Sequence, residues 1–139
     1  MSAPPEAVEI LRQWVRKAEH DLEAARWIMT KEEGSPYDTV CFHCQQAAEK
    51  YLKRLLTLLT IEAPRTHNLA MLAELLPDPY PLSEPPESLA SMNPYAVDIR
   101  YTDDLREPQR ADALRALDLA QAVRADVRKV LPAEALREV

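Results

Sequence analysis

The stretch SPYDTVCFHCQQAAEKYLKRLLTLL, residues 35–59, decides the fold of this chain. Its apolar residues are spaced three or four positions apart, which places them on one face of a helix. They are Cys41, Cys44, Ala48, Tyr51, Leu52, Leu55, Leu58 and Leu59. Ser35 can accept hydrogen bonds from the first free backbone amides, and Pro36 and Asp38 suit a first helical turn. We therefore expect a core helix from Ser35 to about Thr60, with polar residues inserted between the apolar ones.

Similar patterns predict helices on both sides of this segment. Residues 5–31 carry an apolar stripe, and the short break at residues 32–34 indicates an antiparallel hairpin with the core helix. A short helix over residues 69–76 should be capped by Thr66 or Asn68, and two more helices are expected over residues 95–101 and after Pro108. The single glycine leaves few hairpin turns. The sequence therefore predicts an all-α, up-and-down helical bundle of about five helices.

Residues 77–94 form a proline-rich interruption in this pattern. Five prolines fall within the first ten positions, which precludes a long helix or a central strand. We interpret residues 77–94 as an internal loop of one domain spanning residues 1–139, with a turn of helix near residues 87–92.

Composition excludes several classes of protein. One glycine cannot supply the phosphate-binding loop of a P-loop or dinucleotide-binding fold. The sequence has no apolar run of about 18 residues, so no membrane span is expected. The first residues lack the basic and apolar regions of a signal peptide, so we expect a cytoplasmic protein. The net charge of −6 opposes a broadly basic nucleic-acid surface.

A local basic face is still compatible with this acidic average. It would combine side chains from the core helix and from the last helix, namely Lys50, Lys53, Arg54, Arg124, Arg128 and Lys129. Such residues more often form a solvated surface than a binding site.

The Cys41-x-x-Cys44 motif suggests a redox pair or half of a zinc site. The pair lies inside a helix on its apolar stripe, however, and a second pair of ligands is missing. We expect both thiols to pack in the core. The Glu-x-x-His motif of di-iron bundles is also absent. No metal and no cofactor are therefore expected.

Five residues are candidates for binding a nucleotide or its phosphate. An arginine beside a tyrosine, as in Arg100-Tyr101 after Asp98, can bind a phosphate and stack on a base. Alternatively, Arg100 pairs with a carboxylate such as Glu49 and Tyr101 packs against the bundle. His43 borders the apolar face of the core helix, and Lys50 follows on the same helix. The candidates are His43, Lys50, Asp98, Arg100 and Tyr101.

Four segments together resemble a HEPN domain, a small helical family named for nucleotide binding in higher eukaryotes and prokaryotes. They lie in order along nearly the whole chain. The most specific is the block FHCQQAAEKYLK at residues 42–53. The others are the set Trp14…Ala18-Glu-x-Asp21-Leu22…Ala25, Thr66-His67-Asn-Leu69, and Ile99-Arg-Tyr101.

The resemblance implies a four-helix core with short additional helices, usually dimeric, that often works beside a minimal nucleotidyltransferase as a toxin–antitoxin module. It also implies metal-independent ribonuclease activity in members that carry an arginine and a histidine spaced by about four to six residues. No arginine stands at that spacing before His20, His43 or His67, and no histidine follows Arg100. This difference argues against an enzyme.

We therefore expect a homodimeric module that binds a nucleotide or RNA, or docks a nucleotidyltransferase. The alternative is a ribonuclease with a non-standard site built from His43, Asp98 and Arg100. Any pocket should lie between the core helix and residues 98–101. The dimer surface should include apolar side chains such as Trp27 and Tyr95.

Overall fold

Five α-helices and two short 3-10 helices make up the part of the chain that the structure, a computed structural model, describes: residues 4–96 and 107–137. No strand occurs within those ranges, and the predicted all-α fold is confirmed. The elements are α1 (Pro5–Met29), α2 (Tyr37–Leu58), α3 (Leu69–Glu74), α4 (Pro86–Ala90), η1 (Asn93–Ala96), α5 (Arg110–Val130) and η2 (Ala133–Leu136).

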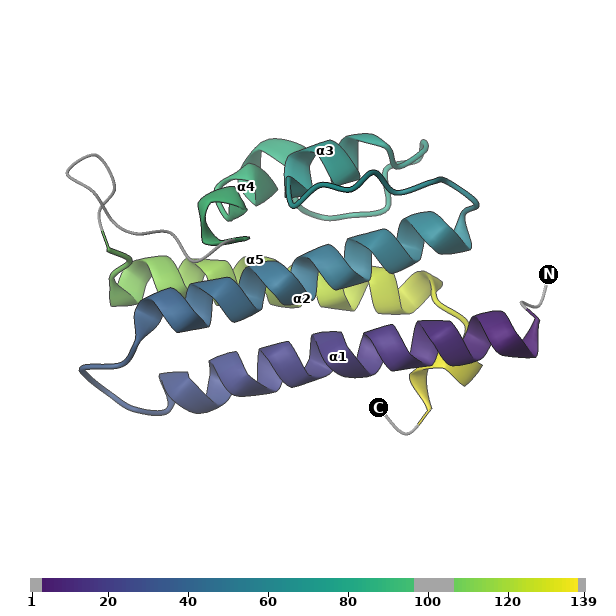
Figure 1. Ribbon diagram of the computed structural model, residues 1–139. Helices are drawn as coiled ribbons and strands as arrows, with labels where there is room; N and C mark the ends of the chain where they lie inside the picture. The colour runs from purple at the N-terminus through teal and green to yellow at the C-terminus, as the bar shows by residue number, and fades with distance from the viewer. Residues whose placement is uncertain (1–3, 97–106, 138–139) are drawn as a thin grey trace.

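Helix α2 is the centre of the arrangement (Figure 1). It runs antiparallel to α1, as predicted, and it also contacts α5, α3 and η1. Helices α2 and α5 point in the same direction. After α2, the chain returns through the short helices α3 and α4 before α5 begins. The third passage of the up-and-down bundle is therefore broken into short pieces, because the prolines between residues 77 and 86 cannot be accommodated inside a long helix.

The proline-rich segment ends in two short helical elements. Helix α4 begins at Pro86, close to the helical turn that we expected near residues 87–92. The 3-10 helix η1 ends at Ala96. Residues 97–101, the remainder of the helix expected over residues 95–101, lie outside the described residues.

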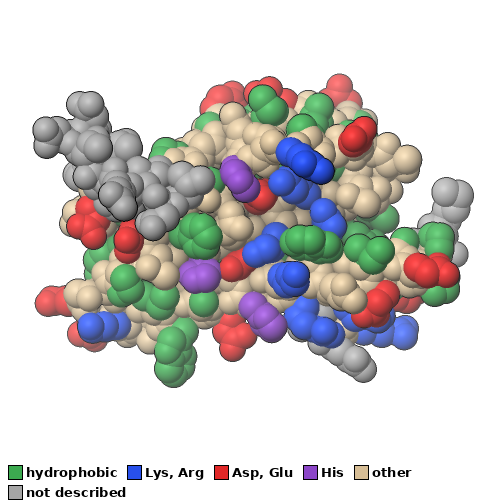
Figure 2. Space-filling model, viewed as in Figure 1, with side chains coloured by type: hydrophobic (Ala, Val, Ile, Leu, Met, Phe, Trp, Pro, Cys, Tyr) green, Lys and Arg blue, Asp and Glu red, His purple; other side chains and the backbone are tan. Residues whose placement is uncertain are grey.

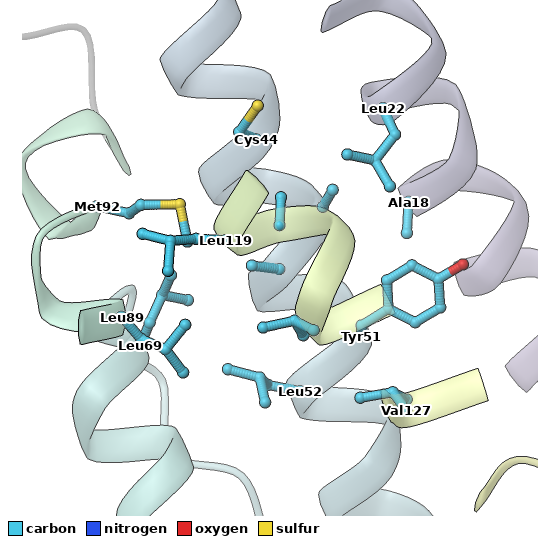
Figure 3. Packing of buried hydrophobic residues seen from close by; sticks show 14 of the residues in the cluster. Ala18, Leu22, Cys44, Tyr51, Leu52, Leu69, Leu89, Met92, Leu119 and Val127 are labelled. Atoms are coloured by element: carbon cyan, nitrogen blue, oxygen red, sulfur yellow. The ribbon is translucent and has the colours of Figure 1, made fainter. Parts of the chain in front are cut away.

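The core lies where α1, α2, α5 and the short helices meet (Figure 3). Leu22, Tyr51 and Val127 come from the three long helices, and Leu69 and Met92 reach the same centre from the other side of α2. Cys41 and Cys44 are fully buried free thiols in this core, as the apolar stripe predicted.

The predicted capping role of Ser35 is wrong. Helix α2 begins at Tyr37 after Pro36, and the first-turn amide of Thr39 donates to Asp38 Oδ1 at 2.9 Å, not to Ser35. The buried Ser35 hydroxyl instead donates backward to the carbonyl oxygens of Ile28, at 3.3 Å, and Lys31, at 3.4 Å. It therefore satisfies backbone carbonyl groups at the C-terminal end of α1. The cap predicted for α3 is confirmed, because the Oδ1 of Asn68 accepts from the backbone amide of Met71 at 3.1 Å.

A single carboxylate ties the three long helices together. The Oε1 of Glu19 on α1 accepts from the Tyr51 hydroxyl of α2 at 2.7 Å. The same atom accepts from Arg124 Nε at 2.7 Å and from Arg128 Nη1 at 2.9 Å, both on α5. Burial raises the pKa of Tyr51 well above its usual range, so its hydroxyl keeps its proton. Arg124 and Arg128 therefore belong to an internal network and not to the basic face considered from the sequence.

The helices within residues 4–96 and 107–137 do not provide a candidate membrane span: none is both long and apolar enough.

Candidate phosphate-binding site on helix α2

A row of polar side chains runs along α2. On one side it faces α1, and on the other it faces His67, in the segment that leads into α3. His43, Gln46, Lys50 and Lys53 recur three or four positions apart, so they share one helical face. Their neighbours in the structure are carboxylates and a histidine. We call the set the α2 polar strip; its members are Asp21, His43, Gln45, Gln46, Glu49, Lys50, Lys53 and His67. Figure 2 shows histidine, basic and acidic side chains gathered on this face of the molecule.

Asp21 of α1 organises one end of the strip. Its Oδ1 lies 2.8 Å from the Nδ1 of His43, and its Oδ2 accepts from the Nζ of Lys50. Because an ionised carboxylate only accepts hydrogen bonds, Nδ1 of His43 carries the proton in this contact. The Nε2 atom has no hydrogen bond to another described residue and remains available to a ligand.

Glu49 organises the other end. Its Oε1 lies 2.7 Å from the Nδ1 of His67 and accepts from Gln45 Nε2 at 3.1 Å. Its Oε2 accepts from Lys53 Nζ at 3.2 Å. Burial would raise the pKa of Glu49, whose exposed fraction is only 7%, but the hydrogen bonds from His67, Gln45 and Lys53 outweigh it and hold the pKa below its usual value. Glu49 is therefore a buried anion held by three side chains.

The two glutamines of the strip connect α2 to the approach to α3. Fully buried Gln45 donates from Nε2 to the backbone oxygen of His67 at 3.1 Å. Its Oε1 accepts from Gln46 Nε2 at 2.7 Å. The polar side chains inserted into the core helix thus fix the position of His67, which lies far from them in the sequence.

The strip offers hydrogen-bond donors whose positions are fixed by carboxylates. An ammonium group has three N–H donors, and Lys50 and Lys53 each use one of them on a carboxylate. The two lysines balance Asp21 and Glu49, so the strip becomes net positive when a histidine is protonated. Such an arrangement suits phosphate oxygens, which accept hydrogen bonds from ammonium and imidazole groups.

The sequence identified part of this strip. It predicted His43 and Lys50, and the structure brings both onto one carboxylate. The sequence did not identify Asp21 as a site residue, and it did not predict the contact between Glu49 and His67. The hairpin between α1 and α2 places Asp21 opposite His43, a relation that depends on helix register. The signal in the sequence was the Ala18-Glu-x-Asp21 piece of the family pattern, which contains both bridging carboxylates of α1.

Three predicted site residues, Asp98, Arg100 and Tyr101, lie outside the described residues. The described chain stops at buried Ala96, at the end of η1. Asn93 at the start of η1 accepts from the Leu69 amide at 2.8 Å and donates to the Asn68 side chain at 2.9 Å. The 3-10 helix η1 is therefore held beside α2 and the start of α3.

The described residues do not contain a group of three or more histidine, cysteine or acidic side chains arranged to hold a metal ion. Both thiols are also unsuited to metal binding in their present state. Burial raises the pKa of Cys41 and of Cys44 to about 12, so each is a neutral thiol.

Comparison with known proteins agrees with this geometry. The pattern of the HEPN domain family matches residues 11–130. The crystal structure of TT1696 from Thermus thermophilus is similar, with a TM-score of 0.69 and 28% sequence identity. The similarity covers 87% of this chain and 98% of TT1696. No curated protein matches the chain.

Proposed function

Because the chain belongs to the HEPN domain family, whose members are nucleotide-related or ribonuclease-like modules, we propose that it binds nucleotides or docks a protein partner. In this proposal residues 1–139 act as one HEPN domain and form a homodimer in the cytoplasm. The partner is a minimal nucleotidyltransferase in a toxin–antitoxin-like pair. The observation that carries the proposal is the α2 polar strip, where Asp21 positions His43 and Lys50. The ammonium group of Lys50 keeps further N–H donors for a ligand.

In the bound state, Lys50 Nζ donates to phosphate oxygens of the nucleotide or of an RNA backbone, and His43 donates to them from Nε2 as the doubly protonated imidazolium. Asp21 keeps both side chains in position. Arg100 adds a phosphate contact, Asp98 orients the arginine, and Tyr101 stacks on the base. The position of η1 against α2 supports this proposal, because η1 leads directly into residues 97–101.

The dimer surface is proposed to include Trp27 on the outer face of α1. This side chain is 76% exposed, which is unusual for a large aromatic residue, and large exposed aromatics are enriched in protein interfaces. Beside it, His20, Arg26 and Thr30 line a shallow hollow. Tyr95 contributes less, because it packs against the core.

Two measurements test the proposal. The melting temperature should rise with added nucleotide in the wild type but not in Lys50→Gln, and it should still rise in Lys129→Gln, which removes a 77% exposed lysine outside the strip. Size-exclusion chromatography with the product of an adjacent nucleotidyltransferase gene should show one complex. Separate elution of the two proteins, together with no nucleotide-dependent change in melting temperature, would refute the proposal.

A metal-independent ribonuclease is the second candidate, favoured by the two carboxylate–histidine pairs of the strip. One imidazole would take the proton of an RNA 2′-hydroxyl, whose oxygen attacks phosphorus. The other, as imidazolium, would give a proton to the departing 5′-oxygen, leaving a 2′,3′-cyclic phosphate. Arg100 would neutralise the phosphate, with Asp98 as its orienting partner.

Cleavage of structured RNA in the presence of a chelator distinguishes the two candidates. The binding proposal predicts intact RNA. Cleavage that disappears in both His43→Gln and Arg100→Ala would instead establish the ribonuclease, whereas cleavage that persists in both would identify a contaminating nuclease.

A further inference from the structure

A hollow of about 650 Å³ lies at the end of the bundle where α1 begins and α2 and α5 end. Figure 1 shows these three helix ends side by side, on the side of the molecule marked by the N-terminus. Apolar side chains from all three helices line the hollow, among them Ile10, Leu58 and Val130. Ile10 is 52% exposed and Val130 is 42% exposed. Part of the apolar wall is therefore in contact with solvent.

One cation, Arg54 of α2, lines this apolar hollow. Its guanidinium carbon lies 4.7 Å from the ring centroid of Trp14, and its Nε is buried without a hydrogen-bond partner. Within residues 4–96 and 107–137, Arg54 has no carboxylate partner. A half-buried charge is costly to keep out of water unless an opposite charge or hydrogen bonds accompany it. Among the described residues, Arg54 is therefore a cation without a paired anion.

A second cation increases this imbalance. The Nζ of Lys17 lies 4.8 Å from the same Trp14 ring, and Lys17 likewise forms no ion pair with a described residue. Two positive charges thus surround one indole. Lys17 does not line the hollow, so Arg54 is the cation that faces a ligand bound there.

Thr57 and Thr60 both line the hollow, and they differ in whether the hydroxyl group is available to donate a hydrogen bond to a ligand. Thr57 already donates to the backbone oxygen of Lys53 at 2.9 Å. Thr60 lies just beyond the end of α2 with a φ of 61°, a left-handed conformation that is strained for a β-branched residue. Its hydroxyl has no hydrogen bond to another described residue, so it is a donor available to a ligand in the hollow that Arg54 also lines.

We propose that this hollow binds a small monocarboxylate with a hydrocarbon body. Its carboxylate pairs with the guanidinium of Arg54 and accepts from the Thr60 hydroxyl, and its hydrocarbon body packs on Ile10, Leu58 and Val130. One lining cation matches one negative charge, whereas a doubly charged phosphate monoester would need further donors. The volume falls in the range of about 300–1,000 Å³ that is typical of small-molecule sites. This site is separate from the α2 polar strip and does not rest on the proposed function.

Calorimetric titration of the full chain with four probes tests this proposal. Octanoate should bind saturably with one molecule per chain, and 1-octanol, acetate and octyl phosphate should each bind more weakly. Arg54→Gln should weaken octanoate binding by about tenfold or more, as expected for loss of a charge-assisted contact. The matched variant Arg115→Gln removes an exposed arginine of α5 and should bind as the wild type does.

Methyl NMR of the wild type locates the ligand without any substitution. Octanoate should shift the methyl signals of Ile10, Leu58 and Val130, and Ile10→Asp, at an exposed position, should abolish binding. The proposal is overturned by absence of saturable octanoate binding, by equal affinity for 1-octanol, or by tighter binding of octyl phosphate. It is also overturned if Ile10→Asp converts a dimer to a monomer, because the hollow would then be covered by a second copy.

Discussion

The Nδ1 atom of His43 lies 2.8 Å from the Oδ1 atom of Asp21, and this contact joins α2 to α1 across the hairpin. The other oxygen of the same carboxylate accepts from Lys50, two helical turns farther along α2. One residue of α1 therefore positions two candidate ligand-binding residues of α2. The position of Asp21 matters for any function of the strip.

Asp21→Asn tests this positioning role. The amide cannot serve as a charged acceptor for both partners, so nucleotide affinity should fall and the free energy of unfolding should decrease by about 1–3 kcal/mol. Calorimetric titration and urea denaturation measure the two effects. Asp118→Asn, at an exposed position on α5, should change stability by less than about 0.5 kcal/mol. Unchanged nucleotide affinity in Asp21→Asn would show that Asp21 does not organise a binding site.

Glu49 should make stability depend on pH in the acid range. Its pKa in the folded chain lies below the usual 4.5, so its contribution is fully present above about pH 4.5 and is lost as the pH falls through the folded value. Urea denaturation across this range should show the wild type losing its advantage over Glu49→Gln as the pH falls. A stability difference that stays constant with pH would contradict the ionised, hydrogen-bonded state of Glu49.

The Glu19 network should be the strongest polar contributor to stability. Glu19→Ala removes the acceptor shared by Tyr51, Arg124 and Arg128, and should lower the free energy of unfolding by about 3–5 kcal/mol because the partners stay partly buried. Glu9→Ala breaks only the exposed pair with Arg12 and should cost about 0–1 kcal/mol. Equal losses in the two variants, measured by chemical denaturation, would argue against the network as the tie between the long helices.

The two thiols should be unreactive in the folded chain. Burial raises the pKa of Cys41 and of Cys44 to about 12, so almost no thiolate exists at about pH 8. A colorimetric disulfide reagent should label neither cysteine under native conditions and both in concentrated urea. Rapid native labelling of either cysteine would be inconsistent with its place in the core.

Much of the fold could be predicted from the sequence, because stripes and caps are local signals. The stripe of residues 35–59 identified α2 and the burial of its cysteines, and the prolines after residue 77 explained the broken third passage. The failure at Ser35 has a physical cause. A serine between two helices can serve either helix, and only the geometry of the hairpin decides that its hydroxyl donates to Ile28 and Lys31.

The site could be predicted only in part. His43 and Lys50 stand out as polar residues within an apolar helix, but their partner depends on the register between α1 and α2. The same limit applies to the basic residues. Lys53, Arg124 and Arg128 looked like members of one positive surface, and the structure pairs each with a carboxylate. Arg54 lacks such a partner among the described residues, and this difference from the other basic residues can be found only from three-dimensional contacts.

Backbone-amide NMR of the isotope-labelled chain, titrated with ATP and with a short single-stranded RNA, tests the central claim most directly. Binding at the α2 polar strip predicts that the largest shifts fall on residues 43–53 and on His67, and that they vanish in Lys50→Gln. Shifts confined to other surfaces, or no shifts at saturating nucleotide, would contradict the assignment of this strip as the phosphate-binding site.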